Sequence, residues 1–165
     1  KNLSRLIEAF ATLKSDVDVQ LVIVGKAQWQ ASQVYKQVLD LKLEERVLFT
    51  GYVSDSELLH LYNAAIVFIY PSIYEGFGLP VLEAMACGTP VIASNTTSLP
   101  EFAKDAAILV DPMNVSEIRE AILEILQVPE LAKTLSRKGL LNIKNFSWRI
   151  TAEATAKVYR SIYKT

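Results

Sequence analysis

Cysteine and histidine are almost absent from this chain of 165 residues. Cys87 is the single cysteine and His60 the single histidine, which excludes an internal disulfide and any zinc site built from several of these residues. The charge is also nearly balanced, because 17 Lys and Arg residues face 18 Asp and Glu residues for a net charge of -1. Nucleic-acid-binding domains carry a strong positive charge, so no nucleic-acid partner is expected.

Long apolar runs are missing as well. The longest candidates, residues 19–24 and 66–71, have the length of a strand and fall far below the ~18 residues of a membrane span. Nothing resembles a signal peptide. With 51% hydrophobic residues, the chain can build its own core, and we expect one cytoplasmic domain. The helical pattern begins directly after Lys1 and Asn2, which indicates a piece of a longer protein.

Helix and strand patterns alternate along the sequence. Helical spacing of apolar residues is found in 3–14, 29–42, 55–62, 79–87, 114–127, 130–145 and 148–163. Ser54 and Glu57 have the spacing of a capping box before the third of these helices. Short Val- and Ile-rich runs predict strands at 19–24, 46–51, 65–70, 90–93 and 107–110. This order predicts an α/β fold: a Rossmann-like, doubly wound parallel sheet, with strands buried on both sides by helices on both faces.

The segment after the third expected strand is the strongest candidate site, because ligands of open parallel sheets bind beyond the carboxyl ends of the strands. Gly76 and Gly78 precede a helix start. There they can adopt positive φ, and the free N–H groups favour an anion such as a diphosphate. Glu75 and Glu83 lie beside this anion site, where carboxylates suit the hydroxyls of an attached ribose or sugar. The simpler alternative is an acid-favoured helix start with two turn glycines.

The same segment resembles a known family. Glu75 and Glu83 are separated by seven residues and enclose Gly-Phe-Gly-Leu-Pro, with Pro71-Ser72 before them and 84–93 after them. This pattern is similar to the C-terminal, donor-binding domain of the retaining glycosyltransferases of group 1, or family 4, which have the B-type fold of two Rossmann domains. The resemblance spans nearly the whole chain and includes 1–10, 21–25, 47–53, 99–101 and 146–148.

The resemblance implies a role for each matched residue. Glu75 would accept hydrogen bonds from the hydroxyls of the donor sugar, and Glu83 would hold the ribose hydroxyls. The ammonium of Lys1 would neutralise the departing diphosphate, so Glu75 and Lys1 would be the catalytic residues. The backbone of Tyr52 and Val53 would meet the nucleobase. Backbone N–H groups would bind the sugar and the diphosphate, and these belong to Gly76, Phe77, Gly78 and Leu79.

The implied reaction transfers a hexose from a nucleoside-diphosphate sugar, a UDP- or GDP-sugar, to a glycan, lipid or other acceptor with retention of configuration. Residues 1–165 would form the donor-binding half, which binds without turnover on its own. The acceptor would reach it through a missing N-terminal domain, and residues 146–165 would form a helix packing back toward that domain. No cofactor and no metal are expected, since no cluster of carboxylates or imidazoles is apparent.

Other interpretations remain open. A sugar-nucleotide epimerase or a phosphorylase could use the same scaffold, and a nucleotide-binding module could do so without catalysis. Residues 130–165 hold eight Lys and Arg against two acidic residues. This basic end forms a solvated helical face, a surface for another domain, or a contact for peripheral association of the full-length enzyme with the cytoplasmic face of the membrane.

The first strand of the family's sheet, which ends in an arginine shortly before the lysine matched by Lys1, is not in this sequence. Strands 19–24 and 65–70 would flank it, and unpaired backbone groups in the interior cost ~1–3 kcal/mol each. We therefore expect that the sequence is part of a longer chain, or that another segment fills the slot. A partner molecule could supply that segment, or the two flanking strands could pair directly.

Overall fold

The structure is a computed structural model that describes residues 1–13, 17–26 and 31–163, and these contain five strands in two sheets. Strands β1 (Leu21–Val24) and β2 (Val47–Gly51) form the first sheet. The second sheet has the order β3 (Phe68–Tyr70), β4 (Val91–Ser94) and β5 (Ile108–Val110). Every strand pair is parallel, which confirms the predicted α/β fold with parallel strands.

Helices precede, connect and follow the strands in the described residues. They are α1 (Leu3–Ala11), α2 (Ala31–Asp40), α3 (Asp55–Ala64), α4 (Leu79–Ala86), α5 (Leu99–Ala103), α6 (Val115–Gln127), α7 (Pro129–Asn142) and α8 (Trp148–Tyr163), with short 3₁₀ helices η1 (Lys104–Ala106) and η2 (Ile143–Asn145). Helix α3 begins with the predicted capping box, since the Ser54 and Glu57 side chains each accept the other residue's backbone N–H. The predicted helix ends at 14 and 29 lie outside the described residues.

Strand β4 lies at the centre of the core. Its Ile92 packs with residues of α1 and α6 in one apolar cluster, while Val91 and Ala93 pack with α4 and α5 in another. Successive residues of a strand point to opposite faces of the sheet. Helices therefore cover both faces of the β3-β4-β5 sheet, as predicted for a doubly wound fold.

Strand β1 differs from the prediction that every strand is buried on both sides. The whole of β4 is buried, but Val22 and Val24 of β1 are 39% and 38% exposed. In the part of the chain that the structure describes, β1 pairs with β2 alone. Its other edge therefore lacks the neighbouring strand that would complete its burial.

A groove of about 1210 Å³ lies between the two sheets, lined by β1 and β3 together with residues of α1 and α6. This is the place where the sequence predicts the slot of the missing first strand. The described residues show no pairing between β1 and β3. The expectation that these two strands close the slot by pairing directly is therefore wrong.

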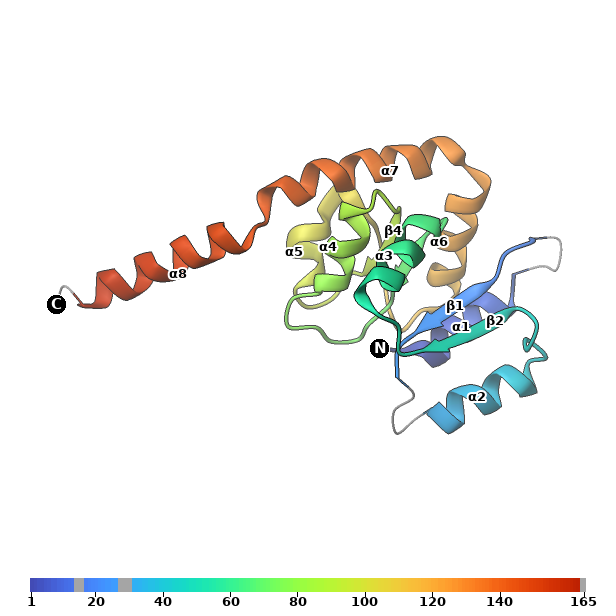
Figure 1. The fold of residues 1–165 in the computed structure, drawn as a ribbon. Coiled ribbons are helices and arrows are strands. Elements are labelled where there is room, and N and C mark those ends of the chain that lie inside the picture. Colours follow the sequence, from blue (N-terminus) through green and yellow to red (C-terminus); the bar gives the residue numbers. More distant parts are fainter. Residues whose placement is uncertain (14–16, 27–30, 164–165) are drawn as a thin grey trace.

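Helix α8 extends away from the rest of the molecule (Figure 1). It buries none of its residues, and Trp148, Tyr159 and Tyr163 are among its exposed aromatic side chains. Its predicted packing toward another domain remains a prediction. Among the helices that the structure describes, none combines the length and the apolar character required to cross a membrane.

Candidate functional site

Glu75 lies between β3 and α4 and is held by residues from distant parts of the chain. Its Oε1 accepts a hydrogen bond from the ammonium of Lys1 and another, of 2.6 Å, from the hydroxyl of Ser72. The Lys1 ammonium also donates to the hydroxyl of Tyr70 at 2.5 Å. The structure therefore brings the two predicted catalytic residues, Lys1 and Glu75, into direct contact.

The ion pair shifts the pKa values of both partners. Burial by itself would raise the pKa of Glu75, but hydrogen bonds from Lys1, Ser72 and Tyr70 outweigh burial and lower it. Burial likewise works to lower the pKa of Lys1, and the hydrogen bonds to Glu75 and Tyr70 outweigh it and raise that pKa. Lys1 and Glu75 are consequently both charged at neutral pH.

Asn2 fixes the position of Lys1. Its amide group donates hydrogen bonds to the carbonyl oxygens of Pro71 at 3.0 Å and Pro112 at 2.6 Å, and its carbonyl oxygen accepts one from Arg5 at 3.0 Å. Its φ of 62° is left-handed, a conformation that Asn tolerates better than most residues. Asn2 thereby ties the start of α1 to the loops after β3 and β5. No functional role was expected for Asn2 from the sequence.

The start of α4 is a candidate anion site. Gly78 is the N-cap with φ of 108°, and no side chain caps the helix. Pro80 in the first turn has no N–H, and the N–H of Val81 donates to the carbonyl oxygen of Gly78 at 3.0 Å, so this turn has fewer open donors than an ordinary helix start. A Cβ at Gly78 would collide with the side chain of Leu99. Gly76 does not use the positive φ expected for it, and a Cβ there would meet no atom within 4 Å among the described residues.

A polar loop after β4 supports residues 71–78, here called the glutamate loop. The hydroxyl of Ser98 lies 3.1 and 2.9 Å from the carbonyl oxygens of Glu75 and Phe77. The hydroxyl of Thr97 accepts a hydrogen bond of 3.3 Å from the N–H of Glu75, and the Phe77 ring stacks on Phe102 with centroids 5.1 Å apart. The loop after β4 and helix α5 thus set the conformation of the glutamate loop.

The predicted nucleotide-binding residues line the groove between the sheets. Tyr52, Val53 and Glu83 all contribute to its surface, together with Lys1. The Oε2 of Glu83 accepts a hydrogen bond of 3.0 Å from the hydroxyl of Tyr62. The structure therefore places Lys1 and three nucleotide candidates around one groove, with Glu75 attached through its ion pair with Lys1.

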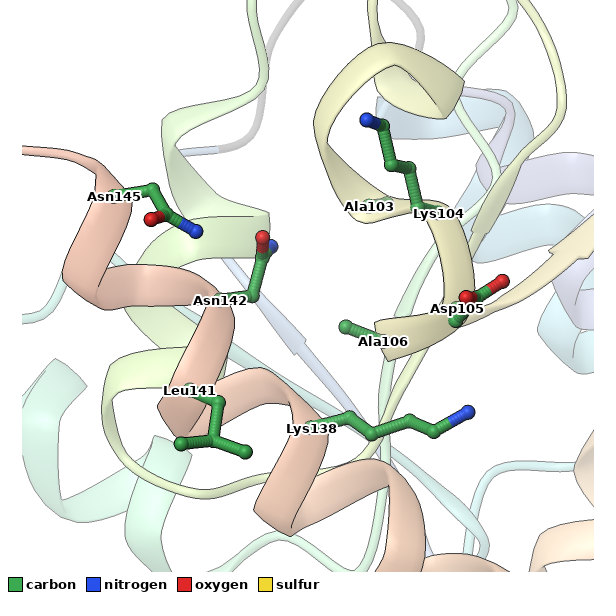
Figure 2. A pocket seen from close by; sticks show the side chains of 8 residues that line it. All are labelled: Ala103, Lys104, Asp105, Ala106, Lys138, Leu141, Asn142 and Asn145. Carbon is green, nitrogen blue, oxygen red and sulfur yellow. The ribbon is translucent and has the colours of Figure 1, made fainter.

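A second pocket holds none of the predicted site residues. It has a volume of about 330 Å³ and lies where the end of α7 meets η1, lined by Ala103, Lys104, Asp105, Ala106, Lys138, Leu141, Asn142 and Asn145. Figure 2 shows the side chains of Lys104 and Lys138 extending in different directions. The ammonium groups of Lys104 and Lys138 therefore do not converge on a common point. In the same pocket, the amide of Asn142 donates a hydrogen bond of 2.8 Å to the carbonyl oxygen of Phe102.

No group of three or more His, Cys, Asp or Glu side chains is arranged as metal ligands within residues 1–13, 17–26 and 31–163. The hydrogen bonds given above for the two predicted glutamates have separate partners. Glu75 interacts with Lys1, Ser72 and Tyr70, and Glu83 interacts with Tyr62. Each carboxylate is thus placed as a hydrogen-bond acceptor.

Known proteins are similar to this chain in sequence. Residues 1–141 match the family model described as glycosyl transferases group 1. The chain is 39% identical over 162 residues to O-antigen chain mannosyltransferase B of Escherichia coli, covering 97% of this chain and 42% of that enzyme. It is 36% identical over 163 residues to the MMP alpha-(1->4)-mannosyltransferase of Mycolicibacterium hassiacum, covering 96% of this chain and 39% of that enzyme.

The fold is shared with solved structures as well. Sucrose-phosphate synthase of Thermosynechococcus elongatus matches with a TM-score of 0.87 and 33% identity, covering 99% of this chain and 43% of that one. The chain thus spans less than half the length of the relatives it matches. Since the family model matches residues 1–141 out of 165, the chain belongs to the group 1 glycosyltransferases.

Proposed function

We propose that this chain binds the nucleoside-diphosphate sugar of a retaining hexosyltransferase. The observation that carries the proposal is the contact of Lys1 with Glu75 beside a groove lined by Glu83, Tyr52 and Val53. A cation, two carboxylate acceptors and an uncapped helix start suit a diphosphate flanked by a ribose and a sugar. The names of the two mannosyltransferase relatives support a hexose as the transferred group.

In this proposal the chain's own residues act by position and charge. The bond between the anomeric carbon and the diphosphate breaks, the acceptor hydroxyl oxygen forms its bond to that carbon on the same face of the sugar, and the proton of the hydroxyl passes to the departing diphosphate. Lys1 stabilises the negative charge that grows on the departing diphosphate, assisted by the N–H groups at the start of α4. Glu75 accepts hydrogen bonds from the sugar hydroxyls and orients the ring.

The proposal extends to the rest of the enzyme. The donor is a UDP- or GDP-sugar, and no resident metal or cofactor takes part. An N-terminal domain binds the acceptor, and α8 packs toward that domain. Transfer takes place on the cytoplasmic side, where the basic residues of 130–165 would favour contact with an anionic membrane surface.

Calorimetric titration of the full-length protein with UDP, GDP and ADP and with their sugar conjugates tests the proposal. Glu83→Ala should weaken binding of the bare nucleotide by about 10- to 100-fold, the loss expected for a charged hydrogen-bond acceptor. Glu75→Ala should leave bare-nucleotide affinity nearly unchanged and remove most of the preference for the nucleotide sugar.

The matched control is Glu130→Ala, which removes an exposed carboxylate paired with Lys133 on α7, and should change neither affinity. Equal losses of bare-nucleotide affinity in the Glu75 and Glu83 variants would contradict the separate roles. An absence of binding to every nucleotide and nucleotide sugar would contradict the proposed function as a whole.

A further inference from the structure

We infer that Tyr62 is a positioning residue that orients Glu83 toward the two ribose hydroxyls and so sets the preference for ribonucleotides. This inference rests on the proposed function. Its basis is the 3.0 Å hydrogen bond from the Tyr62 hydroxyl to Oε2 of Glu83. The two residues come from different helices, α3 and α4, and both line the groove that also holds Tyr52 and Val53.

The donor side of this hydrogen bond is held in place. Tyr62 is 7% exposed, and its ring packs edge-on against Phe68 with centroids 5.3 Å apart. Its backbone carbonyl accepts a hydrogen bond of 2.6 Å from the hydroxyl of Thr89, which is itself buried. The hydroxyl of Tyr62 is therefore a fixed point within the protein.

The acceptor side would be mobile without that fixed point. Glu83 is exposed on the surface of α4, where a glutamate side chain samples several rotamers and loses this freedom when it binds a ligand. The hydrogen bond from Tyr62 selects one orientation of the carboxylate in advance. The Glu83 side chain therefore loses less conformational entropy when the ligand binds.

The hydroxyl also keeps its proton under the conditions where the protein works. Burial, followed by the charge of Glu83 and the hydrogen bond to it, raises the pKa of Tyr62 far above its usual value. Tyr62 therefore acts as a donor, and Glu83 remains the acceptor of the pair.

The geometry leaves room on the carboxylate for a ligand. Within the described residues, Oε1 of Glu83 has no hydrogen-bond partner, and Oε2 has only that of Tyr62. An ionised carboxylate offers about four acceptor positions, so both oxygens can still accept from neighbouring hydroxyls. The 2′- and 3′-hydroxyls of a ribose form such a pair of adjacent donors, and a nucleotide lacking them would leave the remaining acceptor positions of Glu83 unused.

Tyr62→Phe tests the inference, since it removes the hydroxyl and retains the ring that packs on Phe68. Dissociation constants are measured in the full-length protein for UDP and GDP and for their 2′,3′-dideoxy counterparts. The variant should bind the ribonucleotide about two- to tenfold more weakly, the net value of one hydrogen bond. It should bind the dideoxynucleotide as the wild type does.

The decisive comparison repeats the substitution in a Glu83→Ala background, where Tyr62→Phe should have no further effect on ribonucleotide binding. An equal loss for ribo- and dideoxynucleotides, or the same loss without Glu83, would show that Tyr62 acts only by packing and would overturn the inference. Tyr159→Phe, which removes an exposed hydroxyl on α8, is the matched control. A wild-type protein that binds no nucleotide would instead contradict the proposed function.

Discussion

The ion pair of Lys1 and Glu75 shows how single residues prepare the site. The carboxylate side chain is 13% exposed and the lysine side chain 59% exposed, so solvent reaches the pair from the lysine side. Solvent-exposed ion pairs stabilise proteins by only ~0–1 kcal/mol. The pair therefore keeps the ammonium close to the glutamate loop, and under the proposed function it would open at little cost to the diphosphate of the donor.

The pH dependence of stability provides a prediction for this pair. The pKa of Glu75 is lowered from its ordinary value of 4.5, so its stabilising contribution is present above that value and is lost as the pH falls through the folded pKa. Glu75→Gln should therefore lower the free energy of unfolding at neutral pH, by no more than ~1 kcal/mol because Lys1 is largely exposed. Urea unfolding should show the two proteins converging in strong acid, whereas a difference that stays constant with pH would contradict this account.

The sequence indicated candidate site residues but did not indicate the side chains that hold them. Glu75 and Glu83 stand in a motif that is local in the chain, so their spacing alone places them at one helix start. The hydroxyl that holds Glu83 comes from Tyr62, 21 residues away, and Lys1 reaches Glu75 across 74 residues. Such contacts depend on how the helices pack, and no local pattern encodes them. The positive φ of Asn2 is likewise known from the structure alone, since the sequence shows only an asparagine, which tolerates this conformation better than most residues.

At the scale of elements, α4 is the helix on which the candidate site depends. Its N-cap is Gly78, and the side chains of Leu99 and Phe102 from α5 lie against the position that a Cβ of this residue would occupy. The packing of α5 therefore requires a glycine at the N-cap of α4.

Gly78→Ala should be strongly destabilising. A residue with a Cβ is strained at φ of 108°, a conformation that costs ~1–3 kcal/mol, and the collision with Leu99 adds to this strain. Gly76→Ala is the control in the same loop, because its Cβ would meet no described atom within 4 Å, and it should change stability by less than ~0.5 kcal/mol. Thermal unfolding of both variants gives the comparison, and similar losses at the two glycines would refute the role of Gly78.

Elements with strong local signals were predicted well. The Ser54 and Glu57 capping box and the five strands are all present. Helix α5 was missed, since its five residues are too few to show a helical period. The third strand was predicted over 65–70 and is Phe68–Tyr70. Its apolar pattern begins earlier, but the strand starts where pairing with β4 begins.

At the scale of the whole molecule, the described strands form two sheets separated by a groove. Strands β1 and β3 each pair on one side and face the groove on the other. The resemblance to the glycosyltransferase family predicted the interruption, because the family's first strand would lie between β1 and β3, but it could not show whether the flanking strands would move together. Packing of α1 and α6 beneath the groove explains why they stay apart, because Leu6 and Phe10 of α1 and Ile122 of α6 line it.

The unpaired edges of β1 and β3 predict that molecules of the 165-residue chain associate with one another in solution. An unpaired edge is a template for another strand, and Val22 and Val24 on β1 are apolar and more than a third exposed. We therefore expect the weight-average mass in sedimentation equilibrium to rise with protein concentration. Val22→Lys should shift this equilibrium toward the monomer, since a charge on an edge strand opposes pairing between molecules.

Leu39→Lys, which adds the same charge at an exposed leucine of α2, should leave the association unchanged. A wild-type chain that stays monomeric at every concentration, or equal effects of the two lysines, would show that the edges of β1 and β3 are not where the molecules meet.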